Sequence, residues 1–182
     1  AGPEIAVATT KAYSTQLVLL DMLGVYFAKV CGSISDAEYE EIVEELLALP
    51  VKMEAVIEDI DEIKYLASRY FNHNSIFFIG RNLDYALGLE GSLKLKEISY
   101  IHSEAYASGE LKHGTISLIE DGTLVVALGT YKPLFEKTLS NIIEVKARGA
   151  DIVALTSESK AADMSKTAEN VLSVPDTHVI LQ

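Results

Sequence analysis

The chain has few of the residues that build several common kinds of site. Among its 182 residues are one cysteine, Cys31, no tryptophan and four histidines. A single cysteine excludes an internal disulfide and agrees with a reducing cytosol. Neither a cysteine pair nor a His-Glu-x-x-His run is present. We therefore expect a cytoplasmic protein with no metal and no cofactor.

Long apolar runs are also lacking. The longest are short, such as Ile76–Ile79 and Leu124–Leu128, whereas a membrane-spanning helix needs about 20 residues. The first residues, Ala-Gly-Pro-Glu-Ile-Ala, contain no basic region followed by an apolar stretch, so they do not form a signal peptide. We expect no membrane partner.

Basic residues are outnumbered, with 15 Lys and Arg against 27 Asp and Glu and a net charge of −12. This balance argues against nucleic acid as a partner. A phosphorylated ligand would need a local arrangement such as the N–H groups of a helix N-terminus. The turn Gly80-Arg81-Asn82 is not a dinucleotide fingerprint.

The first third of the chain has helical periodicity. We predict a first helix over 10–30, capped by Thr9 or Thr10, and a second over 35–49, begun by Ser35 or Asp36. Pro50 is expected to break the second helix, and a third is predicted over 51–72.

Strands and helices then alternate. We predict strands over 75–79, 123–128, 152–156 and 171–174, separated by helices over 83–101, 133–148 and 159–169. Residues 102–114 are expected to form a loop, with a short helix near 110–119. Mostly apolar strands alternating with helices indicate a parallel sheet covered on both faces. The predicted fold class is therefore α/β, a three-layer αβα sandwich of the flavodoxin-like kind, and ligands are expected at the carboxyl ends of its strands.

The helix over 83–101 carries a charged stripe. Glu90, Lys94 and Glu97 share one face at about 100° per residue, and apolar residues flank them. One interpretation is an intrahelical salt bridge worth only about 0.3–0.5 kcal/mol. The other is an acid–base site on a largely buried helix, where burial shifts pKa values. The spacing leaves both open.

The segment after that helix contains His102 and His113. Histidine can move protons near neutral pH, although a loop histidine is more often structural. His113 is the better candidate, because Gly114 beside it allows backbone to approach a ligand.

Four blocks of the sequence resemble the isomerase half of the glucosamine-6-phosphate synthases, which are glutamine–fructose-6-phosphate aminotransferases. The blocks are Glu4–Ala12, Leu89–His102, Glu104–Tyr106 and Gly109–Gly114. The resemblance runs in order from about residue 1 to about residue 175, and the stretch 89–114 is its most specific part.

The resemblance implies that residues 1–182 form a single sugar-isomerase (SIS) domain, the second of two. Residues 1–9 would lead in from the first SIS domain, and a C-terminal tail would be absent. The implied reaction adds glutamine-derived ammonia to fructose 6-phosphate and isomerises the product to glucosamine 6-phosphate, with no cofactor. The implied partners are the sugar phosphate, the first SIS domain, a glutaminase domain and a second copy in a homodimer.

The same resemblance implies roles for individual residues. Glu97 would move a proton between C1 and C2 of the open-chain sugar, Lys94 would assist at the amine or hydroxyl, and Glu90 would position Lys94. His113 would open the sugar ring in the partner subunit's site. Val7 and Thr9 would touch the substrate near the junction of the SIS domains.

Several features depart from that pattern. The phosphate-binding Ser/Thr loop, the Schiff-base lysine of the tail and the glutaminase cysteine are missing, so we expect the isolated chain to be inactive. Asn82 stands where a glycine is common, and Thr115 where a proline is usual.

Two other functions stay open. A related SIS enzyme could isomerise or deglycate another amino-sugar or fructosamine phosphate. A non-catalytic SIS module could bind a sugar phosphate only.

Overall fold

A computed structural model describes residues 2–58 and 60–182. The chain divides into two compact units. The first comprises the described part of Ala1–Ile57 together with Thr177–Gln182, and the second comprises the described part of Glu58–Asp176.

The first unit contains the long helix α1 (Thr10–Val30) and all but the last residue of a second long helix, α2 (Asp36–Glu58). Ser35 begins α2 as predicted, through a reciprocal capping box with Glu38. The Ser35 N–H donates to Glu38 Oε2 at 2.8 Å, and the Glu38 N–H donates to Ser35 Oγ at 3.2 Å. Thr9 precedes α1 but does not cap it, because its hydroxyl donates to the Val7 carbonyl at 2.7 Å.

The predicted helix break at Pro50 is wrong. Helix α2 continues through Pro50 to Glu58, and α3 (Ile60–Tyr70) follows. Proline removes one helical N–H and tends to kink a helix rather than end it. Strong helix formers flank Pro50 on both sides, at 44–48 and 52–55, and their propensity favours continuing the helix.

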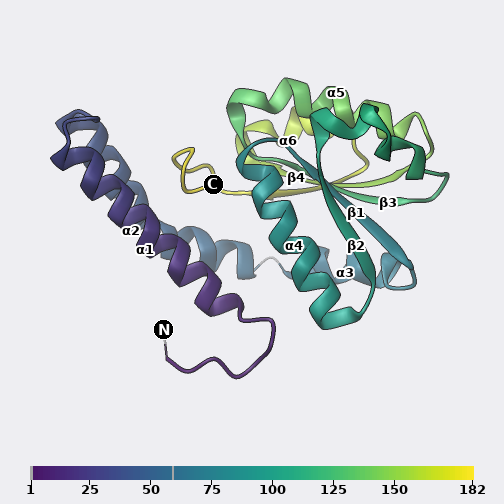
Figure 1. The fold of residues 1–182 in the computed structure, drawn as a ribbon, viewed down its shortest axis with the longest axis horizontal. Coiled ribbons are helices and arrows are strands. Elements are labelled where there is room, and N and C mark those ends of the chain that lie inside the picture. Colours follow the sequence, from purple (N-terminus) through teal and green to yellow (C-terminus); the bar gives the residue numbers. More distant parts are fainter. Residues whose placement is uncertain (1, 59) are drawn as a thin grey trace. The chain divides into compact units, whose positions relative to one another are not determined.

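The second unit is built on a five-stranded sheet, which Figure 1 shows between helices. Its strands are β1 (Ser75–Gly80), β2 (His102–Ala107), β3 (Leu124–Gly129), β4 (Asp151–Ser157) and β5 (Asn170–Val174). They pair in parallel in the order β2-β1-β3-β4-β5. The helical segments are α3, α4 (Leu83–Ser99), η1 (Ser108–His113), η2 (Thr115–Leu118), η3 (Lys132–Leu134), α5 (Phe135–Lys146) and α6 (Glu158–Met164). The predicted three-layer α/β fold is confirmed.

Strand β2 was not predicted, since its residues were assigned to a loop. It pairs with β1 along its whole length, from His102 opposite Ser75 to Ala107 opposite Gly80. The strand is at the edge of the sheet and contains only polar and small residues and one tyrosine. Its extended conformation depends on pairing with a strand distant in sequence, which local propensity does not reveal.

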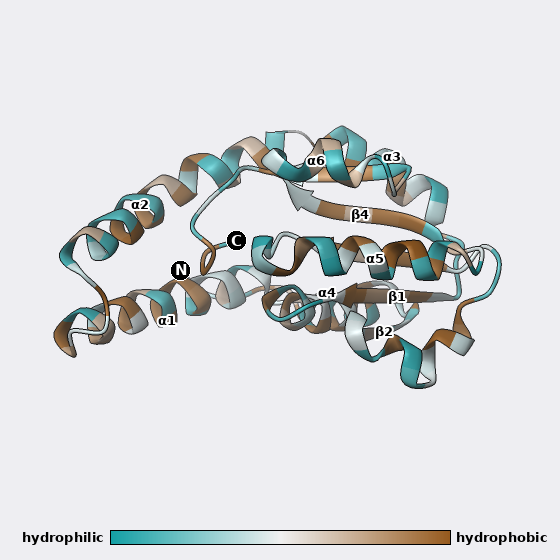
Figure 2. Ribbon diagram, turned by 90° about the horizontal axis from the view of Figure 1, so that it is seen from above, coloured by the Kyte–Doolittle hydropathy of each residue, from teal (hydrophilic) through white to brown (hydrophobic). Residues whose placement is uncertain are grey.

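The two faces of the sheet carry separate cores. Phe77 and Ile79 of β1 face the first core, which includes residues of η1, α5 and α6, namely Leu111, Phe135, Ile142, Val145 and Met164. Ile76 faces the second core, which contains Leu66 and Tyr70 of α3 and Leu95 of α4. Figure 2 shows β1 and β4 as hydrophobic strands among helices of mixed hydropathy. Helix α4 and segment η1 therefore lie on opposite faces of the sheet.

The strand order explains this separation. The chain moves from β1 outward to β2, and then returns past β1 to β3. Right-handed crossovers between parallel strands place connections that run in opposite directions on opposite faces. The connection through α4 covers one face, and the connection through η1 and η2 covers the other.

The turn from β1 into α4 is tight. A Cβ on Gly80 would come within 2.6 Å of the backbone carbon of Asp84, so only glycine fits there. Asn82 has φ 55° and ψ −118°, a conformation that costs a residue with a side chain about 1–3 kcal/mol. Glycine would adopt this backbone without a steric cost.

We expect Asn82→Gly to raise the free energy of unfolding by about 1 kcal/mol, because glycine adopts this backbone without strain. Urea unfolding of the two proteins measures the difference. The matched control is Asn74→Gly, in a loop where φ is not positive; there the added freedom of the unfolded chain should lower stability by a few tenths of a kcal/mol. Equal effects of the two substitutions would contradict the strain at Asn82.

Asp176, just after β5, links three segments. Its carboxylate accepts from the Ser159 N–H at 2.9 Å and the Ser159 hydroxyl at 2.6 Å, and it pairs with Lys132. Burial opposes ionisation, but Lys132 and Ser159 outweigh it and lower the pKa of Asp176 from 3.8 to about 2.

A carboxylate whose pKa is depressed in the folded protein adds stability above its unfolded pKa, and this stability is lost as pH falls through the folded pKa. The loss should therefore occur between about pH 4 and pH 2. We expect Asp176→Asn to reduce the free energy of unfolding at pH 7 by about 1 kcal/mol, allowing for solvent screening. Unfolding measured from pH 7 to pH 2 should show this difference shrinking in that window. If the difference in free energy of unfolding between the two proteins stayed constant from pH 7 to pH 2, ionised Asp176 would not stabilise the fold.

Candidate functional site

The predicted charged stripe on α4 is a connected cluster. Lys94 Nζ lies 2.8 Å from Glu97 Oε2 and 3.3 Å from Glu90 Oε1. Residues three and four apart are neighbours on a helix, so one ammonium group can bridge both carboxylates. All three side chains are only 20–27% exposed. The cluster holds two carboxylates and one cation on a single helix face.

Lys94 stays cationic in this arrangement. The hydrogen bond to Glu97 is the main cause that raises the pKa of Lys94 above 10.5, with a smaller contribution from Glu90, against partial burial. The shift moves the pKa of Lys94 away from neutrality. Lys94 is therefore suited to stabilising negative charge on an oxygen and not to acting as a free amine.

The prediction that α4 is largely buried is wrong for the described chain. Helix α4 packs on the sheet through Gly88 and Ser92, and Ser92 is hydrogen-bonded to Ser103 of β2 at 3.0 Å. At 100° per residue the charged cluster lies on the opposite side of the helix. Its apolar neighbours Leu93 and Ile98 are 43% and 65% exposed. The cluster therefore faces away from its own sheet.

His113 lies at the end of η1, on the other face of the sheet from α4. Its side chain is 75% exposed and its Nε2 lies 3.9 Å from Glu110 Oε2. The structure does not bring His113 together with Lys94 and Glu97. Within one chain, the α4 cluster and His113 therefore form two separate candidate sites.

Val7 and Thr9 belong to the first unit, whereas the other candidate residues belong to the second. Val7 is 82% exposed. Thr9 adopts a left-handed backbone at φ 52° and ψ 31°. That conformation is uncommon for a β-branched residue and can signal a functional constraint.

A polar network beside η1 was not predicted from the sequence. Arg81 donates through Nε and Nη2 to Asn141 Oδ1 at 3.0 and 2.7 Å. Asn141 donates to Glu144 at 3.2 Å, and Lys112 pairs with Glu144 at 2.8 Å. The available signal was an arginine two residues after a predicted strand, in the region where ligands gather in parallel sheets.

A second missed residue is Asp84, in the first turn of α4, which is 2% exposed. Its carboxylate accepts from the Thr130 hydroxyl at 2.6 Å and from the N–H groups of Thr130 and Tyr131 at 3.2 and 3.1 Å. Burial raises the pKa of Asp84, and these hydrogen bonds oppose that shift. Asp84 thus joins α4 to the loop after β3.

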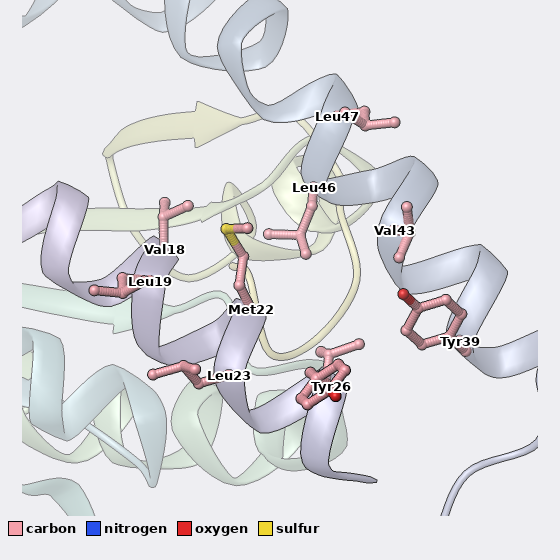
Figure 3. Close-up of a pocket in the computed structure, with 10 residues that line it drawn as sticks. Val18, Leu19, Met22, Leu23, Tyr26, Tyr39, Val43, Leu46 and Leu47 are labelled. Atoms are coloured by element: carbon pink, nitrogen blue, oxygen red, sulfur yellow. The ribbon is translucent and has the colours of Figure 1, made fainter. Parts of the chain in front are cut away.

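An apolar hollow of about 510 Å³ lies between α1 and α2. Figure 3 shows side chains of both helices lining it, among them Met22, Leu46 and Tyr39. None of its lining residues is a carboxylate, histidine or lysine. The hollow contains no acid–base pair, unlike the cluster on α4.

Most of the second unit matches a known domain family. The SIS domain family matches residues 69–180, which include α4 and η1. The chain belongs to the SIS domain family. The charged cluster of this SIS domain and its His113 both lie within the matched range.

Relatives of the SIS domain are much longer proteins. A glutamine–fructose-6-phosphate aminotransferase (isomerizing) of Clostridium tetani is 53% identical over 180 residues, 99% of this chain and 29% of that protein. One of Caldanaerobacter subterraneus subsp. tengcongensis is 51% identical over 177 residues, 97% of this chain and 29% of that protein. The chain spans less than a third of the length of these relatives.

A solved structure has the same fold. The C-terminal domain of glucosamine-fructose-6-phosphate aminotransferase from Francisella tularensis matches with a TM-score of 0.93 and 37% identity, covering 98% of this chain and 51% of that one. This similarity extends over both units of the chain. The assignment of residues 1–68 to the same SIS domain stays a prediction, because the family match begins at residue 69.

The described residues contain neither a candidate metal cluster nor a candidate membrane span. In 2–58 and 60–182, no group of three His, Cys, Asp or Glu side chains is arranged to hold a metal ion. None of the helices described there is long and apolar enough to cross a membrane.

Proposed function

We propose that this chain is the second SIS domain of a cytoplasmic glutamine–fructose-6-phosphate aminotransferase, which makes glucosamine 6-phosphate. The observation that carries the proposal is the 53% identity to such an enzyme over 99% of the chain. The charged cluster on α4 supports it, because a carboxylate beside a cation suits proton transfer next to a carbonyl or imine carbon.

In the proposed reaction Glu97 takes a proton from C1 of the open-chain sugar and returns it to C2. One carboxylate can serve both carbons because they are adjacent in the enediol-type intermediate. The ammonium group of Lys94 stabilises charge that develops on the neighbouring oxygen or nitrogen. Glu90, 3.3 Å from Lys94 Nζ, holds that ammonium group in place.

We further propose that His113 opens the sugar ring in the site of a second copy of the chain. Within one chain, His113 and Glu97 lie on opposite faces of the sheet, so a single copy does not bring them to one substrate. A homodimer related by a two-fold axis provides two equivalent sites that each combine α4 of one copy with η1 of the other.

The remaining parts of the proposal concern the longer enzyme. A preceding SIS domain would hold the phosphate group, and a glutaminase domain would supply ammonia. Val7 and Thr9 would contact the sugar near the junction of the two SIS domains. The 182 residues alone should be inactive, because the phosphate-binding loop and the Schiff-base lysine that the resemblance implies would be supplied by other parts of the longer enzyme.

The test uses the full-length protein with fructose 6-phosphate and glutamine in D2O. Glucosamine 6-phosphate carrying deuterium at C2 is the expected product. Binding of fructose 6-phosphate without any exchange would favour the non-catalytic module. Turnover of a fructosamine phosphate in place of fructose 6-phosphate would favour the related deglycating or isomerising enzyme.

A further inference from the structure

Segment η1 is anchored to the second unit along one side. Leu111 is fully buried in the core under α5. A Cβ on Gly109 would lie 3.1 Å from Arg81 Nη1, so the backbone of η1 rests on the guanidinium group. Lys112 Nζ lies 2.8 Å from Glu144 Oε1 of α5. Three of the six residues of η1 are therefore held by contacts with other elements.

The other side of η1 carries Glu110 and His113. In a 3-10 helix, residues three apart lie one above the other, and these two side chains are 74% and 75% exposed. Because its neighbours in η1 are anchored, the position of His113 depends on how firmly η1 is held.

The anchors of η1 are joined to one another. Arg81 directs Nε and Nη2 at a single acceptor, Asn141 Oδ1. The amide of Asn141 then donates to the same carboxylate of Glu144 that pairs with Lys112. Burial opposes ionisation of Glu144, but Lys112 and Asn141 outweigh it and lower its pKa. The network connects the end of β1, helix α5 and both ends of η1.

We propose that Arg81 and Asn141 are positioning residues that hold η1 so that His113 is presented at the geometry needed to open the sugar ring. This inference rests on the proposed function and deepens it. Neither residue touches the substrate in this proposal. They act by fixing Gly109 and Lys112, the residues on either side of Glu110 and Leu111.

The chemistry of the network favours arginine over lysine. A guanidinium group presents its donors in a rigid plane, whereas an ammonium group is a point charge on a flexible stem; here Nη1, Nη2 and Cζ of Arg81 all lie within 3.5 Å of a Cβ built on Gly109. Arg81→Lys keeps the charge but loses the paired donation to Asn141 and the planar support of Gly109. Asn141→Ala removes the link between Arg81 and Glu144. A displacement of about 1 Å at a reacting group can reduce a rate roughly 100-fold.

The experiment compares two substrates in the full-length enzyme. Fructose 6-phosphate must be ring-opened, whereas 5-deoxyfructose 6-phosphate lacks the hydroxyl that closes the furanose ring and stays open. We expect Arg81→Lys and Asn141→Ala to reduce kcat on fructose 6-phosphate roughly 10- to 100-fold. On the open-chain substrate each variant should stay within about twofold of the wild type, because Glu97 and Lys94 are untouched.

The matched control is Lys146→Met on α5, the helix that also carries Asn141. Lys146 Nζ donates to the Thr167 carbonyl at 2.9 Å and pairs with Glu169, so it anchors α5 without contacting η1. This variant should behave like the wild type on both substrates.

Two results would overturn the positioning role. Equal losses on both substrates would mean that the network acts only on folding, and no loss on either would mean that η1 does not need it. Arg81→Lys leaves the buried core intact, so it carries the test if Asn141→Ala does not fold. Wild-type turnover of fructose 6-phosphate tests the proposed function separately.

Discussion

Replacing Glu97 by glutamine in the full-length enzyme is expected to abolish formation of glucosamine 6-phosphate and deuterium uptake from D2O. Positioned acid–base groups contribute about 10²- to 10⁴-fold to rates, and an amide cannot accept the proton from C1. The loss should appear on both fructose 6-phosphate and its open-chain 5-deoxy analogue, because both reactions require the proton transfer from C1 to C2 and only that of fructose 6-phosphate also requires ring opening.

The fold should survive this substitution. Glu97 lies on the side of α4 that faces away from the sheet, its side chain is 27% exposed, and Lys94 keeps its contact with Glu90 at 3.3 Å. Thermal unfolding and glutamine hydrolysis should therefore match the wild type. Glu136→Gln, an exposed glutamate on α5, is the matched control and should retain full activity. Near-normal turnover by Glu97→Gln would remove this residue from the mechanism.

Replacing His113 by asparagine is expected to reduce turnover of fructose 6-phosphate roughly 100-fold or more. The 5-deoxy analogue needs no ring opening, so its turnover should change little. His113 is 75% exposed and its Nε2 lies 3.9 Å from Glu110 Oε2, so stability should be unaffected. A similar loss on both substrates would place His113 in a later step than ring opening.

A mixing experiment tests which copy His113 serves. Dimers that combine one Glu97→Gln chain with one His113→Asn chain should hold one intact site, made from the unaltered Glu97 of one copy and the unaltered His113 of the other. Random exchange of two inactive homodimers should restore about a quarter of the wild-type activity, since half of the dimers are mixed and each has one of two sites intact. No recovery after verified exchange would mean that both residues act within one chain.

Local sequence patterns predicted much of the fold. Strands β1, β3, β4 and β5 were predicted because each is a short run of mostly apolar residues, and helix α4 because its residues repeat at helical spacing. Both patterns can be recognised within a few neighbouring residues. The pairing of Lys94 with Glu90 and Glu97 was equally predictable, because helical geometry alone brings residues three and four apart together.

The failures involve structure that depends on distant residues. Strand β2 is extended because it pairs with β1, and nothing within its own residues indicates that partner. Helix α2 continues through Pro50 because its flanking residues outweigh one lost hydrogen bond. The network of Arg81 with Asn141 joins residues 60 positions apart, which no local pattern can reveal.

The sequence by itself determined which chemical groups the chain carries and which of them share a helix: an ammonium group between two carboxylates on α4, and a histidine in a segment rich in small residues. Only the tertiary structure decided that these groups lie on opposite faces of one sheet. The physical reason is that the face covered by a crossover depends on the strand order and the right-handed connection, and the strand order is established by pairing between segments far apart in the chain.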